Sequence, residues 1–180
     1  WRQQRNNRPA WLAASTREGE EALLLDAWQQ HPTPALLILV PRHPQRFAEV
    51  GALLSARGIR WQARSKGLPD SDTQVWLGDS MGEMVAYYAC AEFAFIGGSL
   101  LPLGGQNLIE AAACNCPVLI GPHTFNFLQA TKDAIAAGAA RRVTNAEDLL
   151  VTANALLNDQ AAMQAMRQAS RDFATAHQGA

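Results

Sequence analysis

The sequence predicts an α/β fold, a doubly wound parallel sheet of the Rossmann-like type. Short apolar segments alternate with amphipathic helical segments along nearly the whole chain, at the spacing of strand–helix–strand units. Some strand segments, such as residues 36–40, are apolar throughout, which is typical of strands buried on both faces of a sheet. Glycine clusters follow certain strands directly, at the end of the sheet where such folds bind ligands.

Composition restricts the class of protein. The 180 residues are enough for one well-buried domain, and we expect residues 1–180 to form a single domain. A formal net charge of −1 argues against a dedicated nucleic-acid-binding protein. Three cysteines without scaffold spacing favour a reducing compartment, and no zinc-ligand pattern is present, so we expect no metal. No apolar run approaches the roughly 18 residues of a membrane span. Because the chain begins with Trp1, we expect it to be a piece of a longer protein.

The first half of the chain is predicted to alternate regularly. We expect strands at residues 10–14, 36–40, 59–63 and 75–77, and helices at 18–30, from 44 onward, and at 84–90. Ser15 or Thr16 is the expected cap of the first helix, and the acidic run from Glu18 to Glu21 suits the dipole at its start. Pro44 suits the first turn of the second helix.

The second half continues the same pattern. We expect strands at residues 93–96, 118–120 and 140–143, the last at an edge of the sheet, and helices from Gln106–Asn107 and at 127–137, 145–157 and 161–176. Gly138 is the expected cap at the end of the helix before the edge strand.

Four segments that directly follow strands carry the polar and glycine residues expected of a binding site. They are residues 15–20, 41–44, 78–83 and 97–110. Glycines between a strand end and a helix start let ligand phosphates approach the backbone, and the free N–H groups of a helix start favour an anion. Glu110 is expected one turn inside the helix that follows, where a carboxylate can accept hydrogen bonds from a sugar diol. The pattern predicts a nucleotide-sugar site.

These segments, in this order, resemble the C-terminal half of the 3-deoxy-D-manno-octulosonic acid (Kdo) transferases of Gram-negative bacteria. The resemblance rests on Pro41-Arg42-His43-Pro44, on Gly78-Asp79-Ser80-Met81-Gly82-Glu83, and on Gly104-Gly105-Gln106-Asn107 through Glu110. It implies one half of a GT-B glycosyltransferase: the CMP-Kdo-binding domain of an enzyme that transfers Kdo to a lipid A precursor in lipopolysaccharide biosynthesis. Gln106, Ser80 and Ala111 stand where the family commonly has His, Thr and Pro.

The resemblance also implies a CMP pocket. Pro41 and Arg42 would flank the nucleotide, Met81, Gly82 and Glu83 would line the base and ribose, and Asn107, Leu108, Ile109 and Glu110 would hold phosphate and ribose hydroxyls. Further possible donor contacts are Ser15, Gly98, Gly104, Gly105 and Gln106.

No catalytic residue is assigned to this chain. Inverting transfer needs a general base to activate the acceptor hydroxyl, and the resemblance places that base, a Glu, in an N-terminal acceptor domain absent here. We therefore expect the fragment by itself to be soluble and inactive. The resemblance further implies no cofactor, no metal in the transfer step, and a full-length protein associated with the cytoplasmic face of the bacterial inner membrane.

Other interpretations stay open at this point. The chain could be the donor domain of another GT-B enzyme that uses a UDP-sugar, of the lipid disaccharide synthase or epimerase type, or a non-catalytic interaction module on the same fold. A dehydrogenase-type dinucleotide domain is disfavoured because no Gly-x-Gly-x-x-Gly follows the first strand. The residues also have structural interpretations: Glu83 and Asn107 suit helix starts, and the roles of His43 and His123 are undecided.

Overall fold

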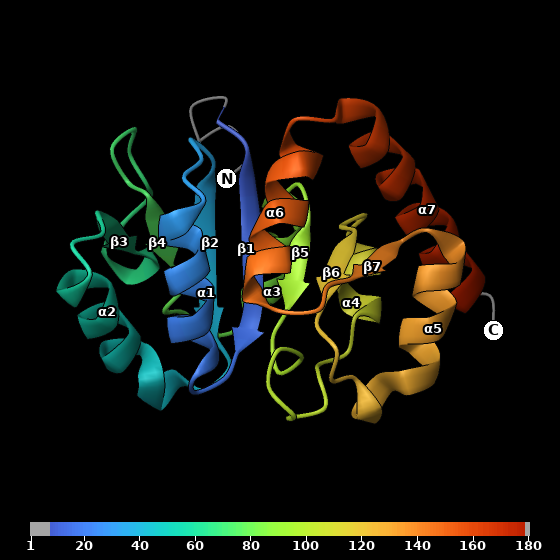
Figure 1. Ribbon diagram of the computed structural model, residues 1–180, viewed down its shortest axis with the longest axis horizontal. Coiled ribbons are helices and arrows are strands. Elements are labelled where there is room, and N and C mark those ends of the chain that lie inside the picture. The colour runs from blue at the N-terminus through green and yellow to red at the C-terminus, as the bar shows by residue number, and fades with distance from the viewer. Residues whose placement is uncertain (1–7, 179–180) are drawn as a thin grey trace.

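The computed structural model describes residues 8–178, which form one seven-stranded sheet with helices on both faces (Figure 1). The strands are β1 (Ala10–Thr16), β2 (Leu36–Pro41), β3 (Trp61–Ala63), β4 (Val75–Leu77), β5 (Ala94–Ile96), β6 (Val118–Ile120) and β7 (Ala140–Arg142). The α-helices are α1 (Glu20–Gln30), α2 (Phe47–Ala56), α3 (Met84–Cys90), α4 (Ile109–Ala113), α5 (Leu128–Ala137), α6 (Ala146–Leu157) and α7 (Gln160–Gln178). Short 3₁₀ turns stand at Pro44–Arg46, Arg64–Lys66 and Phe125–Phe127.

The strand order explains where a ligand site can form. All neighbouring strands pair in parallel, in the order β3-β4-β2-β1-β5-β6-β7. The chain builds one side of the sheet from β1 to β4 and then crosses to β5 on the other side of β1. The order therefore reverses between β1 and β5, and a crevice opens beyond the carboxyl ends of strands at such a point. These ends lie at the lower edge of the molecule in Figure 1.

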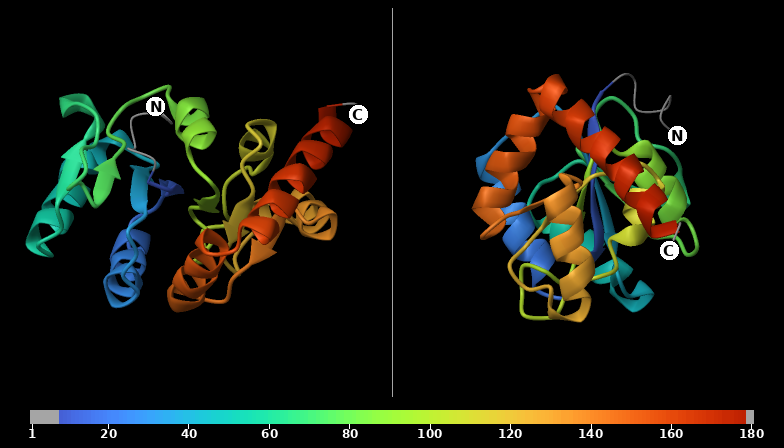
Figure 2. Two further views of the ribbon diagram at one scale, coloured as in Figure 1. Left: turned by 90° about the horizontal axis from the view of Figure 1, so that it is seen from above. Right: turned by 90° about the vertical axis from the view of Figure 1, so that its right-hand side faces the viewer.

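The helices cover both faces of the sheet, so the predicted doubly wound arrangement is confirmed. Helices α1 and α6 lie on one face, and α3 and α4 lie on the other (Figure 2). The first face buries Trp11 of β1 and Leu24 of α1, and the second buries Tyr87 of α3. Helix α7 joins the two layers at one end of the sheet, since Met163 packs in the first core and Phe173 in the second. None of the helices within residues 8–178 combines the length and the apolar character that a membrane span needs.

Most predicted elements are present, but three helix starts differ. Helix α2 begins at Phe47 rather than at residue 44, because Pro44–Arg46 form a 3₁₀ turn ahead of it, so Pro44 lies at the start of that turn and not in the first turn of α2. Helix α1 begins at Glu20, and its N-cap is Gly19 with a left-handed φ of 91° and no side-chain cap bond, so the expected cap at Ser15 or Thr16 is wrong. Strand β1 instead runs on to Thr16 and keeps both residues out of the helix start. Helix α4 begins at Ile109, two to three residues later than expected, because the preceding residues form an extended glycine loop.

Candidate nucleotide-sugar site at the carboxyl ends of the strands

The loops after β1 and β5 meet at the switch point with almost no space between their backbones. Gly97 donates its N–H to the Ala14 carbonyl at 2.7 Å, and a Cβ added to Gly97 would overlap the Ser15 carbonyl oxygen. Ser15 itself has a φ of 57°, which is uncommon for a residue other than glycine. Backbone outliers of this kind concentrate at functional sites, so the junction of Ser15 and Gly97 is a candidate ligand site.

The glycine loop after β5 folds back on itself. Gly98, Gly104 and Gly105 all have positive φ values, of 77°, 89° and 78°. Gly105 donates its N–H to the Gly98 carbonyl at 2.9 Å, and the Gln106 amide lies beside Gly98, 3.4 Å from where a Cβ would stand. The structure therefore brings together the five possible donor contacts Ser15, Gly98, Gly104, Gly105 and Gln106.

The start of α4 holds the next group of predicted site residues. The Asn107 side chain accepts the Ile109 N–H at 3.0 Å, so Asn107 satisfies one donor of the helix start. The Leu108 side chain is 2% exposed and belongs to the core, which leaves only its backbone for a ligand. Ile109 is half-buried against the same core. Glu110 is exposed and is the second residue of α4, rather than one turn inside the helix as the sequence suggested.

The loop after β2 lies against the loop after β1. Pro41 is the buried last residue of β2, and the next residue, Arg42, donates its N–H to the Thr16 carbonyl at 2.8 Å. The Arg42 side chain is exposed. An exposed guanidinium at the carboxyl edge of a sheet is suited to a phosphate or a carbonyl group, since it presents a rigid charged fork.

The loop after β4 carries the third predicted group, and an ion pair and a side-chain hydrogen bond hold it in place. Met81 is 71% exposed, and Gly82 is exposed with a φ of 74°. Glu83 is half-buried and forms an ion pair with Arg64, with 3.3 Å between the charged atoms. The hydroxyls of Ser80 and Tyr87 are 2.6 Å apart, and burial raises the pKa of Tyr87 to about 12. The loop after β4 is thus bonded to the 3₁₀ turn that follows β3, through Arg64, and to α3, through Tyr87.

Sequence reasoning missed the tertiary role of two buried carboxylates in this region, Glu20 and Glu21. Glu20 is 0% exposed and accepts the N–H groups of Arg17 (2.8 Å), Gly98 (2.7 Å) and Leu100 (3.1 Å). Burial raises the pKa of Glu20, and these N–H groups oppose the shift. Glu21 is also buried, accepts the Thr16 hydroxyl at 2.7 Å, and pairs with Arg46 at 2.9 Å.

The helix dipole alone does not account for this acidic pair. Both residues lie in the first turn of α1, as expected, but their burial and their bonds to distant loops give them a tertiary role. The helical spacing of the sequence indicates that the two glutamates face the core, because Glu20 lies four residues before Leu24 and Glu21 four residues before Leu25. Residues at that spacing share one face of a helix, and here that face is the buried one.

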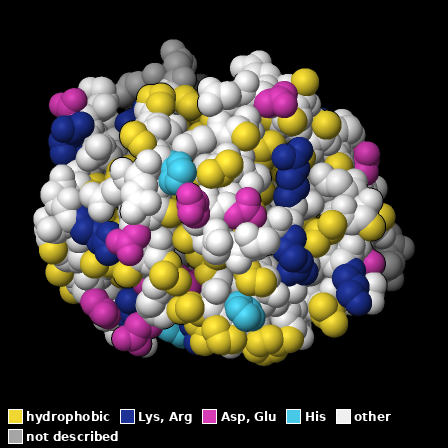
Figure 3. Space-filling model, viewed as in Figure 1, with side chains coloured by type: hydrophobic (Ala, Val, Ile, Leu, Met, Phe, Trp, Pro, Cys, Tyr) yellow, Lys and Arg dark blue, Asp and Glu magenta, His cyan; other side chains and the backbone are white. Residues whose placement is uncertain are grey.

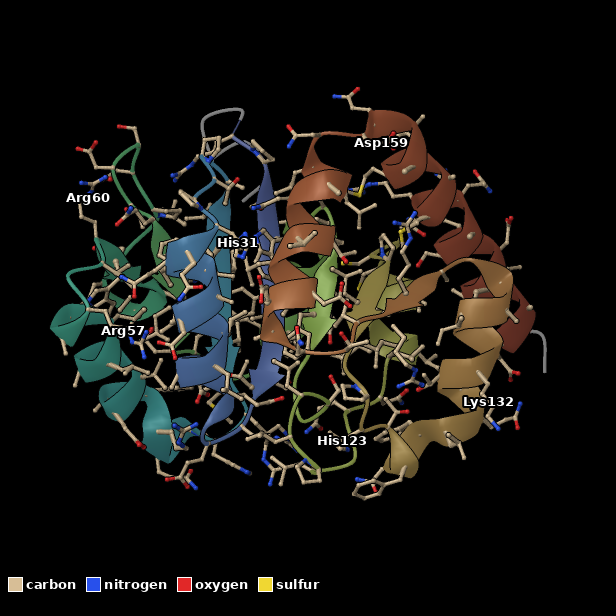
Figure 4. The ribbon with its side chains drawn as sticks, in the orientation of Figure 1. His31, Arg57, Arg60, His123, Lys132 and Asp159 are labelled. Atoms are coloured by element: carbon tan, nitrogen blue, oxygen red, sulfur yellow. The ribbon has the colours of Figure 1, made fainter. Side chains whose placement is uncertain are left out.

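The loop after β6 completes the lower edge. Figure 4 shows His123 below the strand ends, and its backbone N–H donates to the Ser99 carbonyl at 3.0 Å. Apolar side chains are visible along this edge in Figure 3, and Phe125, 62% exposed, belongs to the turn that follows His123. His43 is half-buried in front of the Pro44 turn. Within residues 8–178 no group of three or more His, Cys, Asp or Glu side chains is placed to hold a metal ion.

Comparison with known proteins gives the relationship of the chain. No family model matches it. A 3-deoxy-D-manno-octulosonic acid transferase of Bordetella pertussis is 50% identical over 182 residues, which cover 96% of this chain and 42% of that relative. The chain therefore spans about two-fifths of the length of the curated relatives it matches.

Solved structures support the same relationship. The C-terminal CMP-Kdo binding domain of WaaA from Acinetobacter baumannii has a TM-score of 0.90 and 32% identity, covering 95% of this chain and 92% of that one. HepE of Anabaena in complex with UDP-glucose has a TM-score of 0.70 at 17% identity, which shows the fold alone. The chain belongs to the 3-deoxy-D-manno-octulosonic acid transferase family, as the C-terminal, Rossmann-like half of a GT-B glycosyltransferase.

Proposed function

We propose that this chain binds CMP-Kdo and supplies the donor half of an enzyme that transfers Kdo to a lipid A precursor. The observation that carries the proposal is the junction of the β1 and β5 loops at the switch point of the sheet, where Gly97 abuts Ser15. Family membership supports the choice of Kdo transfer, and similarity to the CMP-Kdo binding domain of Acinetobacter WaaA over nearly its whole length supports CMP-Kdo as donor.

Each predicted group of residues has a part in this proposal. Pro41 and Arg42 flank the nucleotide, and the exposed guanidinium of Arg42 reaches phosphate or the cytosine carbonyl. Met81, with Gly82, offers an adaptable apolar surface to the base. Glu83 and Glu110 are the carboxylates available to ribose hydroxyls.

The glycine loop contributes shape to the proposed pocket more than hydrogen-bond donors. The N–H groups of Gly98 and Gly105 are both bonded within the protein, to Glu20 and to the Gly98 carbonyl. The Ile109 N–H is likewise bonded, to the Asn107 side chain. We assign the rest of the backbone from Asn107 to Glu110 to phosphate, since a helix start favours an anion.

The chemical step requires the rest of the longer protein. A general base must take the proton of the acceptor hydroxyl, and we place that base in the partner domain that binds the acceptor. The two halves would close over donor and acceptor, which excludes water from the reacting centre. Association of the full-length protein with the cytoplasmic face of the inner membrane, where its lipid acceptor is made, belongs to the same proposal.

The proposal is tested by calorimetric titration of this chain with CMP and, in parallel, with UMP. Half of a two-domain pocket should bind weakly, and a dissociation constant of ~0.1–1 mM corresponds to roughly 4–5.5 kcal/mol. We expect CMP to bind more tightly than UMP. Preference for UMP would replace the cytidine assignment with a UDP-sugar donor, and absence of binding by either nucleotide would contradict a nucleotide site in this chain.

Matched variants locate the binding on the proposed surface. Glu110→Ala should weaken CMP binding roughly tenfold, the effect of about 1.4 kcal/mol. Glu147→Ala is the control, because Glu147 is also an exposed glutamate in the first turn of a helix, α6. The isolated chain should show no Kdo transfer, and detectable transfer would overturn the assignment of the catalytic base to the partner domain.

A further inference from the structure

Glu20 connects two loops of the proposed site from inside the protein, the loop after β1 and the loop after β5. Its Oε1 accepts N–H groups from Arg17, in the loop after β1, and from Gly98, in the loop after β5. Its Oε2 accepts the N–H of Leu100. The residue is fully buried, so these bonds are shielded from water, where charge-assisted hydrogen bonds are strongest.

The turn that Glu20 holds is continuous with the start of α4. The Gly98 carbonyl accepts the Gly105 N–H at 2.9 Å, which fixes the return of the glycine loop just ahead of Asn107. Ser99, in the same turn, accepts the Gly121 N–H at 2.9 Å through its hydroxyl. The turn is therefore held by hydrogen bonds to Gly105, Gly121 and Glu20. The Glu20 carboxylate orients the N–H groups of Gly98 and Leu100 toward the protein interior.

Both side-chain oxygens of Glu20 must act as hydrogen-bond acceptors at this position. Three N–H groups converge on two oxygens, and a carboxylate has about four lone-pair directions and no hydrogen to place. A glutamine of the same size could accept with its oxygen, but its amide nitrogen would then face an N–H donor. That donor would be left buried and unsatisfied, which destabilises the turn.

We propose that Glu20 is a positioning residue for donor binding, which presets the Gly97–Leu100 turn and, through it, the segment from Gly104 to Glu110. This inference rests on the proposed nucleotide site, and it adds to that site a residue that touches no ligand. Preorganisation of a binding loop raises affinity because less ordering remains to be done on binding. Glu20 thus contributes to affinity through the loop alone.

The test compares Glu20→Gln with Glu18→Gln. Glu18 is exposed in the loop just before Glu20, so both variants remove one negative charge from the same region. Hydrogen exchange of the Gly98 and Leu100 amides and the CMP dissociation constant are measured by NMR under conditions where all three proteins are folded. We expect Glu20→Gln to speed exchange at both amides and to weaken CMP binding roughly tenfold, with Glu18→Gln within about twofold of wild type.

The outcomes separate this inference from the proposal on which it rests. If CMP binds Glu20→Gln as tightly as wild type while the two amides exchange faster, Glu20 is merely structural and the inference is wrong. If wild type itself does not bind CMP, the proposed function fails first. Should Glu20→Gln fail to fold, Glu20→Asp gives the same comparison, since it keeps the charge but withdraws the carboxylate from Gly98 by one methylene.

Discussion

The α-carbon of Gly97 lies directly against the backbone carbonyl of Ser15, so that position 97 has no room for any side chain. The two residues are far apart in the chain: Gly97 directly follows β5 and Ser15 lies in β1, the strands on either side of the switch point. A Cβ added to Gly97 would also meet the Ala14 carbonyl oxygen, so backbone of β1 lies against Gly97 at two successive residues. A ligand that lies across this junction meets backbone on both sides.

A methyl group at position 97 should therefore be costly. Gly97→Ala should lower the free energy of unfolding by about 2–4 kcal/mol, because the backbone of one strand end must move. Gly82→Ala is the control: Gly82 has a φ of 74° but nothing within 4 Å of an added Cβ, so only about 1 kcal/mol of backbone strain is expected. Urea unfolding measures both. Equal losses in the two variants would contradict the steric account.

The buried pair of Glu21 and Arg46 should matter more than an exposed pair. Arg46→Met should cost about 3 kcal/mol of unfolding free energy, because the buried Glu21 carboxylate loses its partner. Arg57→Met breaks the pair of Arg57 with the exposed Asp26, and a loss of about 0–1 kcal/mol is expected. Thermal and urea unfolding of the two variants check the contrast, and a larger loss in Arg57→Met would refute it.

Ionisation of Glu20 should make the free energy of unfolding depend on pH. Burial raises the pKa of Glu20 in the folded chain above its unfolded value, near the ordinary 4.5, and the neighbouring Glu21 adds to the shift. The folded state thus holds the Glu20 proton more tightly than the unfolded state. The stabilisation is complete below pH 4.5 and is lost as the pH rises through the higher folded pKa.

Glu20→Gln removes this titration, which gives a direct comparison. The unfolding free energy of wild type, minus that of Glu20→Gln, should fall between about pH 4.5 and the folded pKa and then level off. Urea unfolding at half-unit steps from pH 4.5 to 7.5 measures it. A difference that instead grows with pH would mean that the three N–H groups, and not burial, dominate the pKa of Glu20.

Substitution of Met81 should weaken CMP binding with little effect on the free energy of unfolding. Because its side chain is 71% exposed, Met81→Ala should change the unfolding free energy by no more than about 0.5 kcal/mol. Loss of its apolar surface should weaken CMP binding about threefold, the effect of roughly 0.7 kcal/mol. Val151→Ala, at an exposed position on α6, is the control for affinity. An unchanged CMP affinity in Met81→Ala would remove Met81 from the proposed pocket.

Much of the fold followed from local pattern. Continuous apolar runs marked strands such as β2, and Gly138 marks the end of α5 with a left-handed φ of 83°. Helix starts were harder to predict, because they depend on tertiary contacts. Strand β1 continues to Thr16 since it pairs with Pro41 of β2, and no local rule shows that pairing.

The candidate site divides in the same way. Motif residues such as Arg42 and Glu110 could be identified from spacing and from a family resemblance. Their hydrogen-bonded support could not, because Glu20 meets Gly98 across 78 positions of the chain. A single sequence does not show which distant loop a buried carboxylate contacts. Helical spacing shows only that Glu20 lies on the inner face of α1.

The most direct test of the account maps CMP onto the chain by NMR. Amide shift changes on titration with CMP should concentrate at Arg42, at residues 81–83 and at residues 107–110, on the edge where the strands end. A hollow of about 560 Å³ lies between α2 and β3, lined by Gly51 and Trp61 and, at the loop after β4, by Asp79. The amides of Gly51 and Trp61 serve as the internal control. Changes centred on that hollow, with the predicted loops unaffected, would contradict the central claim.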